Sequence, residues 1–223
     1  MARHFELELD HLRTLLIRMG SLVEEQIDLG VRSILESNAS LAQIVIDRDK
    51  KVDEFDNEID KQCMRIFALT QPVAVDLRLL MAALKINNEL ERIGDIAVNL
   101  AERVEPLLPY SDFVKKTSVS LMATGARGMV KDAIDSFVNN DPKLAKKVLE
   151  SDDHIDNLDR EIFGMMVSSM KESPKQVEPA SHVLILSRHI ERLADHATNI
   201  AEDVIFLVNA KIIKHNVNDS ASF

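Results

Sequence analysis

The sequence is poor in the residues that strands and tight turns require. Its 223 residues include six Gly, six Pro, one Tyr and no Trp. Helix formers such as Leu, Ala, Glu, Lys, Arg and Met are abundant instead, which favours helices over strands. With 46% hydrophobic residues, the chain can bury a sizeable core. We therefore expect an all-α globular protein.

Long apolar runs are also absent. No stretch approaches the roughly 18 to 20 consecutive apolar residues that a membrane span needs. The opening "MARHFELELDHLRTLL" lacks a basic segment followed by an apolar one, the pattern of a secretory leader. We expect a cytoplasmic protein.

Cysteine and positive charge are scarce as well. The single cysteine, Cys63, excludes an intrachain disulfide and argues against a cysteine-based zinc site, and its helical apolar context predicts a core residue. The formal net charge of −10 argues against nucleic acid or an anionic lipid surface as the main partner. Cations or basic protein surfaces fit this charge better.

The chain contains an internal repeat of about one hundred residues. The segments "ERIGDIAVNLAE" at 91–102 and "ERLADHATNIAE" at 191–202 are identical at seven of twelve positions. In the same way "DKKVDEFDNEI" at 49–59 matches "DDHIDNLDREI" at 152–162. Two similar halves follow, and we predict two domains, at residues 1–108 and 109–223.

Turn residues divide each half into three segments. Asn, Asp, Ser and Pro favour turns and helix caps, and they end the first helix of each half in "ESNAS" at 36–40 and "NNDPK" at 139–143. The segments "TQP" at 70–72 and "SPKQVEP" at 173–179 separate the second helix from the third, and "EPLLPYSD" at 105–112 joins the halves. The predicted architecture is a tandem repeat of two three-helix bundles, with six long antiparallel helices.

The third helix of each half has an apolar face and an acidic face. Apolar residues recur at steps of three and four, which predicts the seam facing the bundle. They are Leu79, Ala83, Ile86, Leu90, Ile93, Ala97, Leu100 and Val104, then Leu186, Ile190, Leu193, Ala197, Ile200, Val204 and Leu207. At 100° per residue, Glu91, Asp95 and Asn99 lie within about 80° of one another, roughly opposite that seam. The repeated acids are therefore predicted to face outward.

Two interpretations of these acids are open. A solvated charged face is the ordinary explanation of one acid pair at i, i+4, because such a pair costs only about 0.2–0.5 kcal/mol. Four pairs at matching places in both halves favour a specific role instead. Carboxylates one turn apart, with a nearby amide, offer oxygen ligands that suit Mg, Mn, Ca or Fe better than Zn or Cu. The candidate metal ligands are Asp49, Asp53, Glu91, Asp95, Asn99, Asp152, Asp156, Glu191, Asp195 and Asn199.

Other chemical motifs are weaker. His154, His189 and His196 have no histidine counterparts in the first half, so we interpret them as solvent-facing or peripheral. A ferritin-like di-iron centre needs two Glu-x-x-His pairs, and only Glu8/His11 has that spacing. The sequence has no Gly-rich phosphate loop, nucleophile elbow or Cys/His dyad pattern. We identify no catalytic residue and no organic-cofactor site, and we do not expect an enzyme.

Together these motifs resemble the PhoU family, bacterial regulators of phosphate uptake and phosphate signalling. The resemblance is carried by "ELERIGD" matched by "HIERLAD", and by the block "LTQPVAVDLRLLMAALKINNELERIGDIAVNLAER". It runs nearly end to end, and also includes "FELELDHLRTLLIRMGSLVEEQI" and "SRHIERLADHATNIAEDVIFLV".

The resemblance implies a cytoplasmic adaptor and not an enzyme. Such an adaptor would act between the ATPase subunit of a phosphate-specific ABC transporter and a sensor histidine kinase, and would repress the phosphate-starvation response. It implies divalent or trivalent metal ions, namely Fe, Mn or Mg, as single ions or multinuclear clusters on the matched acid pairs. It also implies a homodimer that reaches the membrane only through its partners and binds no nucleic acid.

Alternatives to this function remain. A metal-independent helical adaptor could use its acidic surfaces only to dock basic partners. A metalloenzyme would need an open coordination position, and no nucleophile or base is evident for it. Direct phosphate sensing conflicts with the negative charge unless bound metal offsets the acids.

Overall fold

The computed structural model describes residues 2–73 and 75–210, and every regular element in these two segments is helical. The six long helices are α1 (Ala2–Leu35), α2 (Ala39–Leu69), α3 (Val75–Glu102), α6 (Val119–Asn139), α7 (Pro142–Glu172) and α8 (Val177–Asn209). Four short helical turns connect them: α4 (Val104–Leu107), η1 (Leu108–Tyr110), α5 (Ser111–Val114) and η2 (Pro174–Gln176). The predicted all-α class is confirmed.

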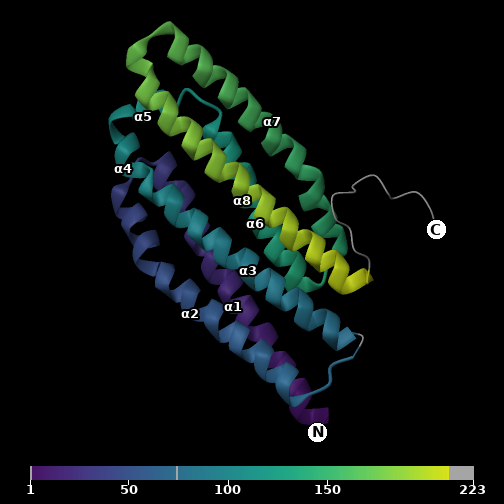
Figure 1. The fold of residues 1–223 in the computed structure, drawn as a ribbon. Helices are drawn as coiled ribbons and strands as arrows, with labels where there is room; N and C mark the ends of the chain where they lie inside the picture. The colour runs from purple at the N-terminus through teal and green to yellow at the C-terminus, as the bar shows by residue number, and fades with distance from the viewer. Residues whose placement is uncertain (1, 74, 211–223) are drawn as a thin grey trace, which may run out of the picture.

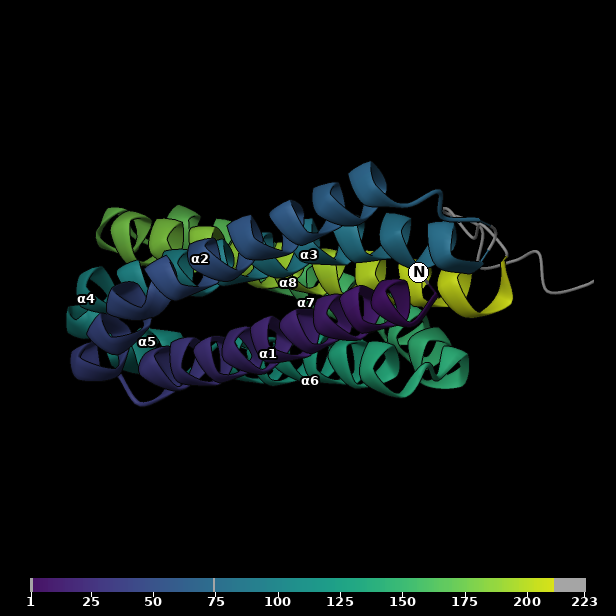
Figure 2. The ribbon, with the colours of Figure 1, turned by 90° about the horizontal axis from the view of Figure 1, so that it is seen from below.

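The long helices form two three-helix bundles, as predicted. Helices α1, α2 and α3 pack against one another, and so do α6, α7 and α8. Figure 1 shows the long helices lying along roughly one direction, with α3 beside α8 where the bundles meet. Figure 2 shows α1 beside α6 at the same junction. The two halves are therefore joined along their length by two helix pairs.

Both of these helix pairs are antiparallel. Along α3, Lys85 pairs with Asp203 of α8, whereas the later residue Glu89 pairs with the earlier His196. Between α1 and α6, Arg127 lies 2.6 Å from Asp28, and the next turn of α6 places Lys131 3.1 Å from Glu24. This arrangement relates the halves by an approximate twofold rotation perpendicular to the helices.

The internal repeat is visible in the helix ends. At the start of α2, the side-chain oxygen of Asn38 accepts hydrogen bonds from two backbone N–H groups of the first turn. Asp141 does the same at the start of α7. Each cap follows a residue with positive φ, 51° at Ser37 and 49° at Asn140. Polar residues with short side chains therefore end one helix and begin the next at matching positions.

One hydrophobic core runs through both halves. Every residue of the predicted third-helix seams is buried, and Cys63 is fully buried, as expected. The predicted boundary between residues 108 and 109 lies within η1. As a boundary between separately folding domains it stays a prediction. In residues 2–73 and 75–210, no helix has the length and apolar content that crossing a membrane requires.

Candidate functional site

Helices α2 and α3, which pack against each other, bring the first set of acids near one another. We call this set the first acidic row: Asp49, Asp53, Asp56, Glu91 and Asp95. Partial burial raises the pKa of Asp49, and repulsion from Asp53 on its own helix and Asp95 on α3 raises it further. The pKa of Glu91 is raised by burial and then by Asp95, Asp56 and Asp53. Carboxylates from neighbouring helices are therefore close enough to repel one another.

Helices α7 and α8 repeat this arrangement. The second acidic row comprises Asp152, Asp156, Asp159, Glu191 and Asp195. Burial raises the pKa of Asp152 to about 6, helped by repulsion from Asp156, Asp195 and the neighbouring Asp153. Burial also raises the pKa of Asp195, and repulsion from Asp156 on α7 is the next cause. In both halves, therefore, the acids of the second and third helices lie near one another.

A buried polar residue supports each row from the third helix, and sequence reasoning missed both of them. Asn87 is 1% exposed, and its amide donates to Oδ1 of Asp56 at 2.8 Å and to Oδ1 of Asp60 at 3.3 Å. At the matching position, the buried hydroxyl of Ser187 donates to Asp159. The signal was present in the sequence, because both positions are polar although they lie next to the apolar seam.

The two candidate amides do not join the rows in the same way. Asn199 donates its Nδ2 to Oε2 of Glu89 on α3, 3.1 Å away. The structure therefore turns the amide nitrogen of Asn199 toward the junction between the halves. Asn99 is half-buried on α3. In the described residues its side chain has no hydrogen bond to the first acidic row.

The histidines occupy different environments. His154 is exposed, as expected. The expectation is wrong for His196, which is 7% exposed and lies with Nδ1 2.6 Å from Oε2 of Glu89. His189 is half-buried, and its pKa is lowered by burial and by the charges of Arg103 and Arg192. The packing of α8 against α3 buries His196, and a pattern within one helix does not reveal that contact.

A groove of ≈ 390 Å³ lies along the junction of α3 and α8. In it, Lys85 lies 2.6 Å from Asp203, and its ammonium also lies 5.7 Å from the ring centroid of Phe206. The groove is lined by Met81, Leu84, Lys85, Asn88, Glu89, Asn199, Glu202 and Asp203. The pairs Lys85–Asp203 and Glu89–His196 therefore join the two halves along this groove.

The acidic rows suit a hard cation in chemistry. Their donors are carboxylate oxygens, and Oε2 of Glu191 is buried without a hydrogen-bond partner in the part of the chain that the structure describes. An unpartnered buried carboxylate oxygen is costly, so a ligand there would relieve a real penalty. However, within residues 2–73 and 75–210 no group of three or more His, Cys, Asp or Glu side chains is gathered closely enough to hold an ion. Binding would therefore require these partly exposed side chains to turn toward one another, which rotamer changes allow.

Fold and site together define a class: an internally duplicated six-helix protein with an acidic row on each bundle. The PhoU domain pattern matches residues 16–104 and 119–204. The chain belongs to the PhoU family.

Individual relatives agree over most of their length. The chain is 38% identical to a protein of Aquifex aeolicus, over 93% of this chain and 94% of that one. It is 35% identical to a protein of Pseudomonas putida, over 96% of this chain and 84% of that one. Both relatives bear the name phosphate-specific transport system accessory protein PhoU homolog.

Solved structures show the same fold. The crystal structure of PhoU from Pseudomonas aeruginosa matches with a TM-score of 0.86 at 34% identity, covering 93% of this chain and all of that one. The crystal structure of the phosphate transport system regulatory protein PhoU from Streptococcus pneumoniae matches with a TM-score of 0.83 at 23% identity. The match covers 94% of this chain and 99% of that one. The second likeness supports the fold alone.

Proposed function

We propose that the chain is an accessory protein of a phosphate-specific transport system, and that it works as a cytoplasmic adaptor without catalysing a reaction. The observation that carries the proposal is its likeness, over most of both chains, to relatives that bear this name. The partners that we propose are the transporter's ATPase subunit and a sensor histidine kinase. Membrane association would come only through these partners. The regulatory effect would be repression of the phosphate-starvation response, and the active form a homodimer.

Metal binding is the second part of the proposal. The first acidic row would hold an ion through Asp49, Asp53, Glu91 and Asp95, and the second through Asp152, Asp156, Glu191 and Asp195. Oxygen-only donors favour Mg, Mn or Fe among the common ions. A bound ion would offset the mutual repulsion of the carboxylates and could bridge to oxygens of a partner. The raised pKa of Glu91 and of Asp152 and the unpartnered Oε2 of Glu191 support this.

A direct binding experiment tests the proposal. Affinity for the purified ATPase subunit and for the cytoplasmic part of the kinase would be measured with Mn²⁺ and with EDTA. We expect tighter binding with Mn²⁺, and loss of that gain in the variant Asp49→Asn/Asp53→Asn/Glu91→Gln/Asp95→Asn. The control is Glu54→Gln/Glu58→Gln, which removes exposed acids of α2 outside the row. If neither protein binds the chain under either condition, the adaptor function is wrong.

A metal-independent adaptor is the alternative, and one observation favours it. Arg160 and Arg188 already form ion pairs with Asp156 and Glu191, so the acids accept guanidinium groups of the kind a basic partner would present. On this alternative, affinity would be the same in Mn²⁺ and EDTA. It would fall with salt and in the acidic-row variant.

A further inference from the structure

Arginines contact the second acidic row at two points. Nη2 of Arg160 lies 3.3 Å from Oδ2 of Asp156 on the same helix, α7. Nη1 of Arg188 lies 2.9 Å from Oε1 of Glu191 on α8. Both acids are candidate cation ligands. Two of the second row's carboxylates are therefore occupied by positive charge from the chain itself.

The first acidic row has asparagines where these arginines stand. Asn57 matches Arg160 in the repeat, and its amide donates to the backbone oxygen of Asp53, 2.7 Å away, and not to a carboxylate. Asn88 matches Arg188 and is exposed at the edge of the α3–α8 groove.

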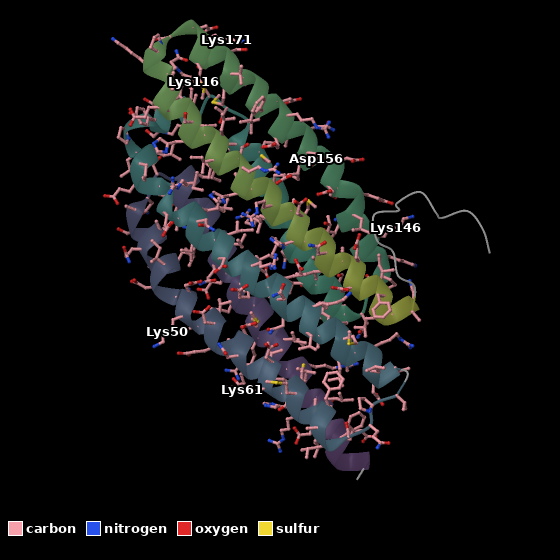
Figure 3. The ribbon with its side chains drawn as sticks, viewed as in Figure 1. Lys50, Lys61, Lys116, Lys146, Asp156 and Lys171 are labelled. Carbon is pink, nitrogen blue, oxygen red and sulfur yellow. The ribbon has the colours of Figure 1, made fainter. Side chains whose placement is uncertain are left out.

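No lysine or arginine takes over that role in the first row. Among the described residues, no salt bridge involves Asp49, Asp53, Asp56, Glu91 or Asp95. Arg48 and Lys50 flank Asp49 in the sequence, and Arg92 follows Glu91. Arg48 pairs with Glu25 of α1 instead, and Lys50 is exposed. Arg92 is also exposed, and its charge opposes the rise in the pKa of Glu91 without forming an ion pair with it. Figure 3 shows Lys50 pointing outward from α2. Within residues 2–73 and 75–210, the carboxylates of the first row are therefore free of ion pairs.

The two acidic rows have matching acids but differ in their ion pairs. A cation that enters the second row must displace a guanidinium from each of two ligands, and each displaced arginine loses a charge-assisted hydrogen bond. In the part of the chain that the structure describes, the first row has no ion pair that an entering cation would have to displace. Asp153 follows Asp152, where Lys50 follows Asp49, so the charge beside the two rows would by itself favour the second row. The ion pairs oppose that advantage.

We propose that the two acidic rows are inequivalent: the first row binds a cation first, and Arg160 and Arg188 restrain the second until they are displaced. This proposal rests on the cation binding proposed above. It makes the second row responsive to anything that draws the arginines away, such as an acidic partner or a higher cation concentration. The first row would then bind a cation readily, and the second row would bind one only after its arginines are displaced.

Separate measurement of each row tests the proposal. Asp152→Asn/Asp156→Asn/Glu191→Gln/Asp195→Asn leaves only the first row intact, and Asp49→Asn/Asp53→Asn/Glu91→Gln/Asp95→Asn leaves only the second. Free Mn²⁺ would be followed by its electron paramagnetic resonance signal during titration. We expect the first row to bind about three- to tenfold more tightly, the range that two partly exposed ion pairs can supply.

Exchange of the residues between the halves gives the decisive comparison. In the second-row protein, Arg160→Asn/Arg188→Asn should tighten Mn²⁺ binding by a similar factor. In the first-row protein, Asn57→Arg/Asn88→Arg should weaken it. The control is Lys146→Asn/Lys171→Asn, which removes the same charge from α7. Figure 3 shows Lys146 and Lys171 toward opposite ends of that helix with Asp156 between them, so we expect less than about a twofold change.

The outcomes separate this inference from the proposed function. Equal affinity of the two rows, or a lysine control that matches the arginine variant, would overturn the inference and leave cation binding intact. Failure of both rows to bind Mn²⁺ in folded protein, checked by circular dichroism, would overturn the cation binding itself.

Discussion

Nδ1 of His196 lies 2.6 Å from Oε2 of Glu89, and this contact joins α8 of one half to α3 of the other. The same carboxylate oxygen accepts a hydrogen bond from Asn199. Burial alone would raise the pKa of Glu89, but the hydrogen bonds from His196 and Asn199 and the nearby charges of His196 and Arg92 lower it overall. The folded protein therefore prefers this glutamate ionised.

Glu89→Gln should weaken the junction of the halves. The change removes a charged acceptor from the buried His196 and the exposed Asn199, so we expect a loss of about 1–3 kcal/mol in the free energy of unfolding, measured with urea at pH 7. Because the folded pKa lies below the ordinary value of 4.5, this stability is present above that pH and is lost as pH falls through the folded pKa. The loss should therefore shrink in acid. Glu54→Gln, on the exposed face of α2, is the control, and an equal loss there would contradict the prediction.

Asp152→Asn should stabilise the metal-free protein at alkaline pH. The folded pKa of about 6 lies above the ordinary aspartate value of 3.8, so folding is favoured when the group is protonated. That contribution is complete below the unfolded pKa and is lost as pH rises through about 6. We expect a gain of about 1 kcal/mol at pH 8 in EDTA, after discounting for partial exposure, and almost none at pH 4. Urea titrations at the two pH values would check it, and destabilisation at pH 8 would contradict it.

Bound metal should make the wild-type protein more stable than Asp152→Asn. An ion that binds only the folded state adds stability in proportion to the logarithm of its concentration over its Kd. Removal of a ligand carboxylate weakens this linkage. In millimolar Mn²⁺ we therefore expect the wild-type chain to gain more thermal stability than Asp152→Asn, measured by circular dichroism. An equal gain in both proteins would show that Asp152 is not a ligand.

Gln26→Met should make the protein more stable. Gln26 is fully buried on α1, and within residues 2–73 and 75–210 neither its Nε2 nor its Oε1 has a hydrogen-bond partner. Its counterpart in the second half is Met129, which is also buried. Replacing an unsatisfied amide by an apolar group of similar shape should add about 1–3 kcal/mol to the free energy of unfolding in urea. The reverse change, Met129→Gln, should destabilise, and a loss of stability from both changes would contradict the argument.

Sequence patterns predicted the features that depend on one helix or on its repeat. Periodic apolar residues determine which face of α3 or α8 is buried, because neighbours three and four residues apart share a face. The caps at Asn38 and Asp141 follow from short polar side chains that satisfy the first N–H groups of a helix. The register of the acid pairs was evident from the duplication alone.

Features that depend on how the halves dock were not predictable in this way. His196 was expected at the surface because its counterpart is Ile96, not a histidine, yet an apolar counterpart was itself a sign of burial. Asn199 and Asn99 look equivalent within the repeat. Only Asn199 meets a carboxylate on the facing helix, because Glu89 has no acidic counterpart at His189. The approximate twofold axis makes the backbones of the two halves alike. Contacts between the halves still differ, because the side chains at matching positions differ.

A last prediction concerns how closely α1 and α3 pack. A Cβ added at Gly30 would lie 3.3 Å from the backbone oxygen of Ala97 on α3, and that oxygen cannot rotate away as a side chain can. A Cβ added at Gly128 on α6 would meet nothing within 4 Å. Both changes remove the same conformational penalty of glycine in a helix, worth about 0.5–1 kcal/mol.

The matched pair separates packing from helix propensity. Gly128→Ala should raise the free energy of unfolding by about 0.5–1 kcal/mol. Gly30→Ala should lower it by about 1–2 kcal/mol, because overpacking costs more than the propensity gains. Urea titrations of the two variants would check both values. A gain in both would mean that α3 can shift by a few tenths of an ångström at little cost. The acids of α3 would then be free to move relative to those of α2, as an ion binding in the first acidic row would require.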